Sequence, residues 1–178
     1  MNNGLSKRPE GYDRFLVSLK ERIRSSQLQA AQAVNTSLVT LYWGIGKEIL
    51  ERQQELGWGA KVVNQLASDL KKEFPNVKGF SSRNLNYMRR LAEIWPNEEI
   101  VQQLLHNLPW FHLCVITDKV KSRIEQEWYI KTCVQYGWSR SILAAQIDTN
   151  LYDREGKAIT NFEDTLPATQ SDLSLIHI

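Results

Sequence analysis

Arginine and asparagine side chains recur along one stretch of the sequence at a spacing that suits contact with DNA bases. Arg83, Asn86 and Arg90 follow one another at i, i+3 and i+7, which places them within about 60° of arc on an α-helix. Arginine and asparagine bind guanine and adenine edges with two hydrogen bonds each. We therefore predict that these three side chains contact bases or the groove of a nucleic acid, with Tyr87 and Arg89 flanking them.

Lysines just upstream add to a local surplus of positive charge. Residues 61–90 hold seven lysines and arginines against two acidic residues, whereas the whole chain of 178 residues has a formal net charge of only +2. A local surplus of this kind attracts a polyanionic partner. We predict that Lys71, Lys72 and Lys78 contact phosphates. The alternative is that this surface is the solvated polar face of an ordinary amphipathic helix, and DNA is not distinguished from RNA.

Two helices separated by a turn are needed to present these side chains. Residues 60–74 have apolar residues at helical spacing and end before Pro75, which cannot continue a helix. Ser81 suits the N-cap of a second helix over residues 81–95, because its hydroxyl accepts a bond from a free N–H of the first turn. The pattern predicts a helix-turn-helix, a motif whose second helix enters the major groove.

The periodicity elsewhere is also helical, so the predicted fold is an all-α, multi-helix bundle with a helix-turn-helix core. Two short extended strands at a turn would show too little periodicity to be detected, so the sequence does not exclude a small β-wing beside the helix-turn-helix. Gly44 and Gly46 lie inside a helical stretch, where each costs about 1 kcal/mol relative to alanine, and we expect a neighbouring helix or tryptophan to approach them closely. The expected helices begin near Tyr12 and cover residues 30–54, 97–107, 122–134 and 139–152, with a compact apolar segment over 109–116. The expected organisation is a tail over residues 1–11, a domain over 12–152 and a linker over 153–178.

Histidines and cysteines do not form a recognisable metal site. His106, His112 and Cys114 match no common zinc spacing, and we expect no metal or other cofactor. Cys114 and Cys133 lie in apolar surroundings and are expected to be buried free thiols. The six tryptophans are expected to anchor the core, with base stacking in a single-strand groove as the alternative.

Carboxylates at nuclease-like spacing are interpreted as chance. Metal-dependent nucleases hold two or three carboxylates around a magnesium ion. Neither candidate group here follows an apolar strand that would fix its geometry, so no catalytic residue and no small-molecule substrate are expected. The groups are Glu155 and Lys157 with Asp148 and Asp153 upstream, and Asp69 with Lys71.

The amino-terminal residues and the hydropathy of the chain indicate its compartment. The first ten residues lack an apolar signal segment. No stretch approaches the roughly 18 apolar residues that a membrane span needs. We therefore expect a cytoplasmic protein without membrane contact.

Several motifs follow one another in order along about residues 12–172. They are Tyr42–Lys47, Gly57–Gly59, Leu70–Pro75, Gly79–Leu85, Leu108–Trp110, Tyr136–Arg140, Leu151–Tyr152 and Lys157–Phe162. Together they resemble the N-terminal domain of the YhcG family. In this family Leu-Pro-Trp is usually followed by glycine and histidine, whereas here Phe111 precedes His112.

The resemblance implies a bacterial protein of two parts. A helical, DNA-binding N-terminal domain of unknown function would precede a C-terminal part that resembles a PD-(D/E)XK nuclease, and family members are associated with mobile elements and genome defence. The family pattern should continue beyond Leu173, whereas residues 174–178 look like translated adaptor sequence. The resemblance therefore implies a fragment that lacks its nuclease domain.

Together, residues and resemblance predict a DNA-binding or DNA-targeting domain of a YhcG-like nuclease, non-catalytic in this form. The alternative is a protein-interaction or dimerisation module of the same nuclease, whose helices present an apolar face to a partner; a homo-oligomer is left open. Added salt separates the two, because phosphate contacts release counterions and a helix–helix interface does not.

Overall fold

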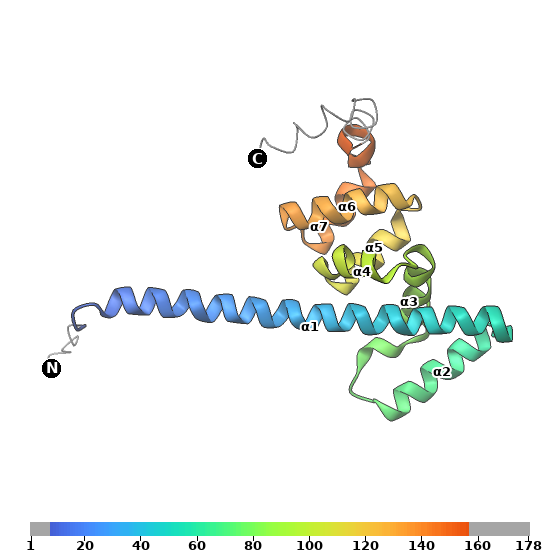
Figure 1. Ribbon diagram of the computed structural model, residues 1–178. Coiled ribbons are helices and arrows are strands. Elements are labelled where there is room, and N and C mark those ends of the chain that lie inside the picture. Colours follow the sequence, from blue (N-terminus) through green and yellow to red (C-terminus); the bar gives the residue numbers. More distant parts are fainter. Residues whose placement is uncertain (1–7, 157–178) are drawn as a thin grey trace, which may run out of the picture.

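The computed structural model describes residues 8–156, which form helices joined by turns (Figure 1). The predicted all-α fold is confirmed, and these residues contain no strand that would form a small wing. None of the helices among them is both long and apolar enough to cross a lipid bilayer. The elements are α1 (Tyr12–Leu56), α2 (Ala60–Glu73), η1 (Lys78–Phe80), α3 (Ser82–Ile94), α4 (Glu98–Gln103), η2 (Leu105–Asn107), α5 (Trp110–Lys119), α6 (Arg123–Tyr136), α7 (Arg140–Asp148) and η3 (Tyr152–Gly156).

Parts of the predicted tail and linker lie outside the described residues. These are residues 1–7 and 157–178, which include Lys157 of the candidate nuclease group and the adaptor-like residues 174–178.

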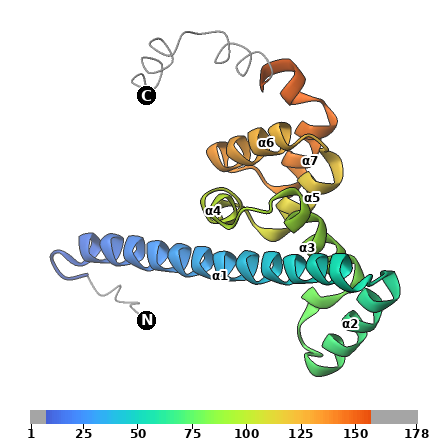
Figure 2. The same cartoon turned by 45° about the vertical axis from the view of Figure 1, so that its right-hand side comes forward.

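A single helix of 45 residues, α1, forms the spine of the molecule. The sequence predicted two helical stretches because apolar spacing fades around Ser25 and Ser26, but this segment contains neither glycine nor proline, and the helix runs through it. Residues 12–34 are exposed, apart from the half-buried Leu16 and Leu19. In both views this first half of α1 extends away from the other helices, which pack around the second half (Figures 1 and 2).

Glycines end two of the helices in the same way. Gly57 and Gly137 adopt left-handed backbone angles, with φ of 67° and 62°, and their N–H groups donate to Gln53 and Cys133. Only glycine adopts this conformation without a penalty from Cβ, which explains why a glycine stands at both corners.

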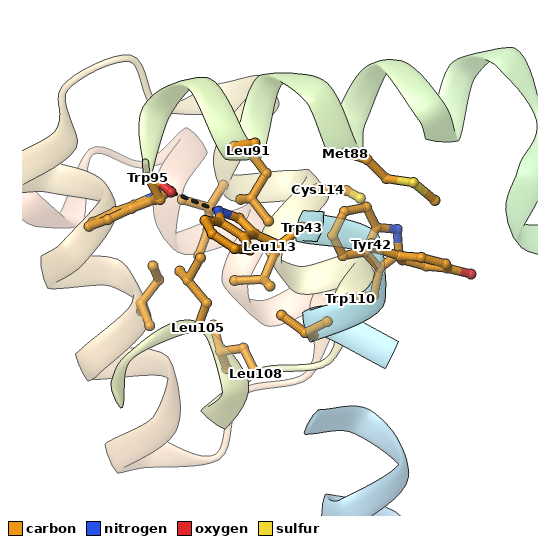
Figure 3. Packing of buried hydrophobic residues seen from close by; sticks show 14 of the residues in the cluster. Tyr42, Trp43, Met88, Leu91, Trp95, Leu105, Leu108, Trp110, Leu113 and Cys114 are labelled. Carbon is orange, nitrogen blue, oxygen red and sulfur yellow. Dashed lines mark hydrogen bonds between the residues drawn. The ribbon is translucent and has the colours of Figure 1, made fainter. Parts of the chain in front are cut away.

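The close packing of α3 against the second half of α1 builds the core (Figure 3). A Cβ added to Gly46 would overlap the carbonyl group of Met88 and lie 2.8 Å from the backbone nitrogen of Arg89. The expected close approach is therefore confirmed at Gly46. At Gly44 no such neighbour lies within 4 Å, and packing does not explain this glycine.

Tryptophan side chains connect the core elements by hydrogen bonds. Trp43 Nε1 donates to the carbonyl oxygen of Trp95 at 2.8 Å, and Trp95 Nε1 donates to Oε1 of the buried Gln126 at 3.2 Å. Trp43, Trp95 and Trp110 are at most 5% exposed, which confirms them as core anchors. The other three tryptophans, Trp58, Trp128 and Trp138, are half-buried.

The predicted pair of helices is present, but its connection is long. Helices α2 and α3 pack against each other, and residues 74–81, including η1, join them. A helix-turn-helix usually has a turn of about three to four residues. The helix-turn-helix interpretation therefore stays a prediction.

The carboxyl-terminal half differs from expectation in detail. The helix expected over residues 97–107 is divided into α4 and η2, and the apolar segment after Pro109 is the helix α5. Helix α6 begins where expected, but the side chain of Ser122 makes no capping bond. Helix α7 ends at Asp148, and η3 follows it, with Tyr152 packed edge-on against Trp128.

Candidate nucleic-acid interface

The amphipathic character predicted for α3 is confirmed. Ser81 caps the helix by accepting a hydrogen bond from the backbone nitrogen of Asn84 at 3.2 Å. Leu85 and Met88 are fully buried. Arg83 and Asn86 are exposed on the other side of the helix. Burial of the apolar side thus fixes which side chains of α3 face the solvent.

Three predicted contact residues of α3 converge on one carboxylate of α5. Arg90 donates to Asp118 Oδ1 and to the carbonyl oxygen of Thr117, both at 3.0 Å. Tyr87 donates its hydroxyl hydrogen to Asp118, and Arg83 donates to the Tyr87 oxygen at 3.4 Å. The hydrogen bond to Asp118 raises the pKa of Tyr87, with burial adding to the effect. The hydrogen bond with Tyr87 likewise raises the pKa of Arg83.

Asn86 and Arg89 lie outside this network. The amide of Asn86 donates to the carbonyl oxygen of Ser82 at 2.9 Å, and Arg89 forms an exposed ion pair with Glu93 at 3.3 Å. In both cases the partner is another residue of α3, one helical turn away along the same helix. Such local contacts are weak and leave both side chains able to bind another group.

The three lysines predicted to contact phosphates are exposed and precede α3 in the chain. Lys71 and Lys72 lie in the last turn of α2, and Lys78 begins η1. Within residues 8–156, none of the three forms an ion pair. A structural role remains open for Lys71 and Lys72, because cations in the last turn stabilise a helix through its dipole.

A pocket of about 800 Å³ lies beside the first turn of α3. Residues of α1, η1, α3, α5 and the start of α7 line it, and three cationic side chains, Lys78, Arg83 and Arg140, face one carboxylate, Asp118. Asp118, Arg140 and Phe111 are absent from the functional residues predicted from the sequence. Only the tertiary packing brings them beside α3, because α5 and α7 follow α3 at a distance in the sequence.

The candidate metal ligands His106 and His112 make hydrogen bonds to different parts of the protein. His106 Nε2 lies 2.9 Å from the hydroxyl of Thr40, and burial lowers the pKa of His106. His112 Nε2 lies 3.0 Å from the carbonyl oxygen of Trp138. Cys114 and Cys133 are buried free thiols, as expected, and this burial raises the pKa of Cys114 to about 12 and that of Cys133 to about 11. In the described part of the chain, no three histidine, cysteine or acidic side chains gather as a metal site would require.

Among the described residues, the candidate nuclease carboxylates form no group of three that could hold a metal ion. Asp148 forms an ion pair with Lys119 at 2.7 Å, at the end of α7. Asp69 accepts a hydrogen bond from Gln65 within α2. Asp153 and Glu155 are exposed in η3.

Comparison with known proteins agrees with the motifs found in the sequence. The family described as "DUF1016 N-terminal domain" matches residues 18–154. The chain is 24% identical over 176 residues to the protein named "Putative nuclease YhcG" of Escherichia coli (strain K12), with 81% of this chain and 46% of that protein covered. The chain thus spans about half the length of this relative. No solved structure matches it. The resemblance to the YhcG family is confirmed.

Proposed function

Because the chain belongs to the DUF1016 N-terminal domain family, and a relative is named "Putative nuclease YhcG", we propose that it is a non-catalytic domain that places a nuclease on DNA. In this proposal α3 lies in the groove of a duplex. Arg83, Asn86 and Arg90 contact bases or groove edges, with Tyr87 beside them. A cytoplasmic location, as expected from the sequence, suits this role.

The arrangement of cations around α3 is the observation that supports the proposal best. Arg90 and Tyr87 of α3 already donate hydrogen bonds to an oxygen anion, Asp118, and Arg83 donates to the Tyr87 oxygen. Phosphate oxygens accept hydrogen bonds from arginine in the same way. The network therefore preorganises guanidinium groups on the exposed side of the helix.

In the proposed complex, contacts to the DNA phosphates come from residues that precede α3 and from α3 itself. Lys71, Lys72 and Lys78 precede the helix, and Arg89 lies on it beside the groove-facing residues. Such contacts set the position and orientation of a protein on the duplex without specifying sequence. Four contacts of this kind imply strong salt dependence, because each neutralised phosphate releases a counterion.

The test is fluorescence anisotropy of a labelled duplex at 50 and 200 mM salt. Four phosphate contacts give a salt exponent of about 3.6, so affinity should fall about 150-fold over this range. Replacing Lys71 and Lys72 by glutamine should reduce the exponent by about two. The matched control replaces Lys20 and Lys131, which lie in the projecting half of α1 and in α6. Absence of duplex binding at 50 mM salt by folded protein would contradict the proposal.

An RNA duplex serves as the second probe in the same assay. Its deep, narrow major groove does not admit side chains, so groove contacts from α3 should be lost. Equal affinity for DNA and RNA duplexes would show that α3 does not enter a major groove.

The projecting half of α1 supports a second candidate function, as a protein-interaction or dimerisation module. It exposes apolar side chains of the kind that other helices usually cover: Phe15, Val17, Ile23, Leu28 and Val34 are 49–68% exposed. Light scattering after gel filtration tests self-association directly. A concentration-dependent dimer that Ile23→Glu dissociates would favour this candidate, and a monomer at all concentrations would count against dimerisation.

A further inference from the structure

We propose that the pocket beside α3 accepts the base of an unpaired nucleotide, so that the domain prefers DNA with an unstacked base over a perfect duplex. The proposal rests on the proposed function and specifies its substrate class. The pocket's volume of about 800 Å³ lies within the range of ligand-binding pockets.

The walls of the pocket suit a flat, apolar ring. They are formed mainly by Leu38, Tyr42, Val77, Trp110, Phe111 and Val115. Tyr42 and Trp110 pack edge-on with ring centroids 4.8 Å apart, and both are buried. By contrast, Phe111 is 61% exposed and Val77 is 44% exposed, although both line the pocket. An exposed aromatic ring of this kind offers a stacking surface for a base.

Cations surround this apolar wall. Arg83 lies over the ring of Tyr87 at 5.7 Å, and Arg140 lies over the ring of Phe111 at 5.6 Å. Lys78 completes the set of three cationic side chains that line the pocket. Asp118, which opposes them, is already hydrogen-bonded to Arg90 and Tyr87. The positive surplus suits the phosphates that accompany a base in DNA.

The polar groups of the pocket explain why the ligand would be a base attached to DNA rather than a free metabolite. Asn84 accepts a hydrogen bond from Trp110 Nε1 at 2.7 Å and donates to the carbonyl oxygen of Gly79 at 2.6 Å. The protein therefore uses one N–H and one lone pair of this amide and fixes its orientation. Stacking tolerates every base, and affinity for the rest of the DNA would come from α3.

The location of the pocket favours an unpaired base over a paired one. The faces of a paired base are covered by its neighbours in the stack, and only its edges reach the grooves. Because Arg83 both lines the pocket and belongs to the proposed groove-facing residues, a strand bound along α3 passes the pocket mouth. A base that is already unpaired enters at a lower cost, because no base pair has to be broken.

The test compares two labelled duplexes that differ by one nucleotide. One carries a single bulged 2-aminopurine, and the other carries the same base paired with thymine. The wild-type protein should bind the bulged duplex about five- to 150-fold more tightly, which is the range for stacking of one base on an aromatic side chain. The fluorescence of the bulged 2-aminopurine should change on binding.

Substitutions of Phe111 locate the effect. Phe111→Ala and Phe111→Leu should both remove the preference, because leucine keeps an apolar surface and loses the flat ring. Ile124→Ala is the matched control, since Ile124 is 62% exposed on α6 and does not line the pocket. Circular dichroism is used to check that each variant is folded. Because Phe111 and Ile124 are both exposed, we expect their substitutions to leave the fold intact.

The outcomes separate this proposal from the proposed function. Salt-dependent binding of the paired duplex with no preference for the bulge would overturn the pocket proposal and leave the DNA-binding function in place. A preference that survives both Phe111 substitutions would also overturn it, because the base would then lie elsewhere. Failure to bind either duplex would overturn both proposals.

Discussion

Two glycines in α1, only two positions apart, should respond to alanine with opposite signs. At Gly46 the added Cβ overlaps the backbone carbonyl of Met88, which cannot rotate away, so α1 and α3 must separate. Overpacking of this kind costs up to about 3 kcal/mol, and the gain in helix propensity returns about 1 kcal/mol. We expect Gly46→Ala to lower the free energy of unfolding by about 2 kcal/mol. Gly44→Ala meets no atom within 4 Å and should raise it by about 1 kcal/mol.

Thermal denaturation followed by circular dichroism measures both effects. For a chain of this size, 1 kcal/mol shifts Tm by about 2–4 °C. The melting temperature should therefore fall by about 4–8 °C for Gly46→Ala and rise by about 2–4 °C for Gly44→Ala. If Gly46→Ala melted at or above the wild-type temperature, the contact between α1 and Met88 would be wrong. A rise in melting temperature for both variants would show that helix propensity alone governs these positions.

Three further predictions follow from the contacts of α3, the buried thiols and the tryptophan chain. Asp118→Asn removes the anion that holds Arg90 directly and Arg83 through Tyr87; because an exposed ion pair is worth about 0.2–1 kcal/mol, DNA affinity in the anisotropy assay should rise about 1.4- to fivefold, and unchanged affinity would argue against DNA contacts from these arginines. Burial raises the pKa of the Cys114 thiol to about 12, so folding favours its protonated form; the stabilisation is complete below the ordinary thiol pKa of 9.0 and is lost as pH rises from there toward about 12. Urea denaturation should accordingly show a smaller loss of stability between pH 8 and 10 for Cys114→Ala than for wild type, and equal losses would contradict the burial argument. Trp95→Phe leaves the buried Oε1 of Gln126 without its donor, which should cost about 1–3 kcal/mol beyond the loss of packing in urea denaturation, whereas a variant as stable as wild type would show that the bond contributes nothing.

Local patterns predicted most of the helices, because their causes lie within a few residues of one another. The hydroxyl of Ser81 caps α3, and Pro75 follows the end of α2, as the sequence indicates. The sequence did not predict that α1 is one continuous helix. Apolar periodicity marks the side chains that a helix buries, and the first half of α1 buries almost none. At η2 periodicity fails for a different reason, because a single 3₁₀ turn of three residues is too short to show a repeat.

The composition of the candidate site was only partly predictable. The helical wheel places Arg83 and Arg90 on one side of α3, and the structure agrees. It carries no information about Asp118, which reaches α3 from α5, nor about Arg140, which begins α7. Such partners depend on how helices pack, and one sequence without its fold does not show which of many acidic residues will face α3.

The division of α1 into a free and an embedded half has a consequence for hydrogen exchange. Its backbone hydrogen bonds are continuous, yet residues 12–34, about 33 Å of helix, gain no stabilisation from burial beyond Leu16 and Leu19. From Asn35, whose amide donates to the carbonyl oxygens of His106 and Leu108, the helix is tied to the core. Amides in the first half should therefore exchange through local fraying, and those near Gly46 only through opening of the whole core. One element of secondary structure thus contains two units of stability, with their boundary at Asn35.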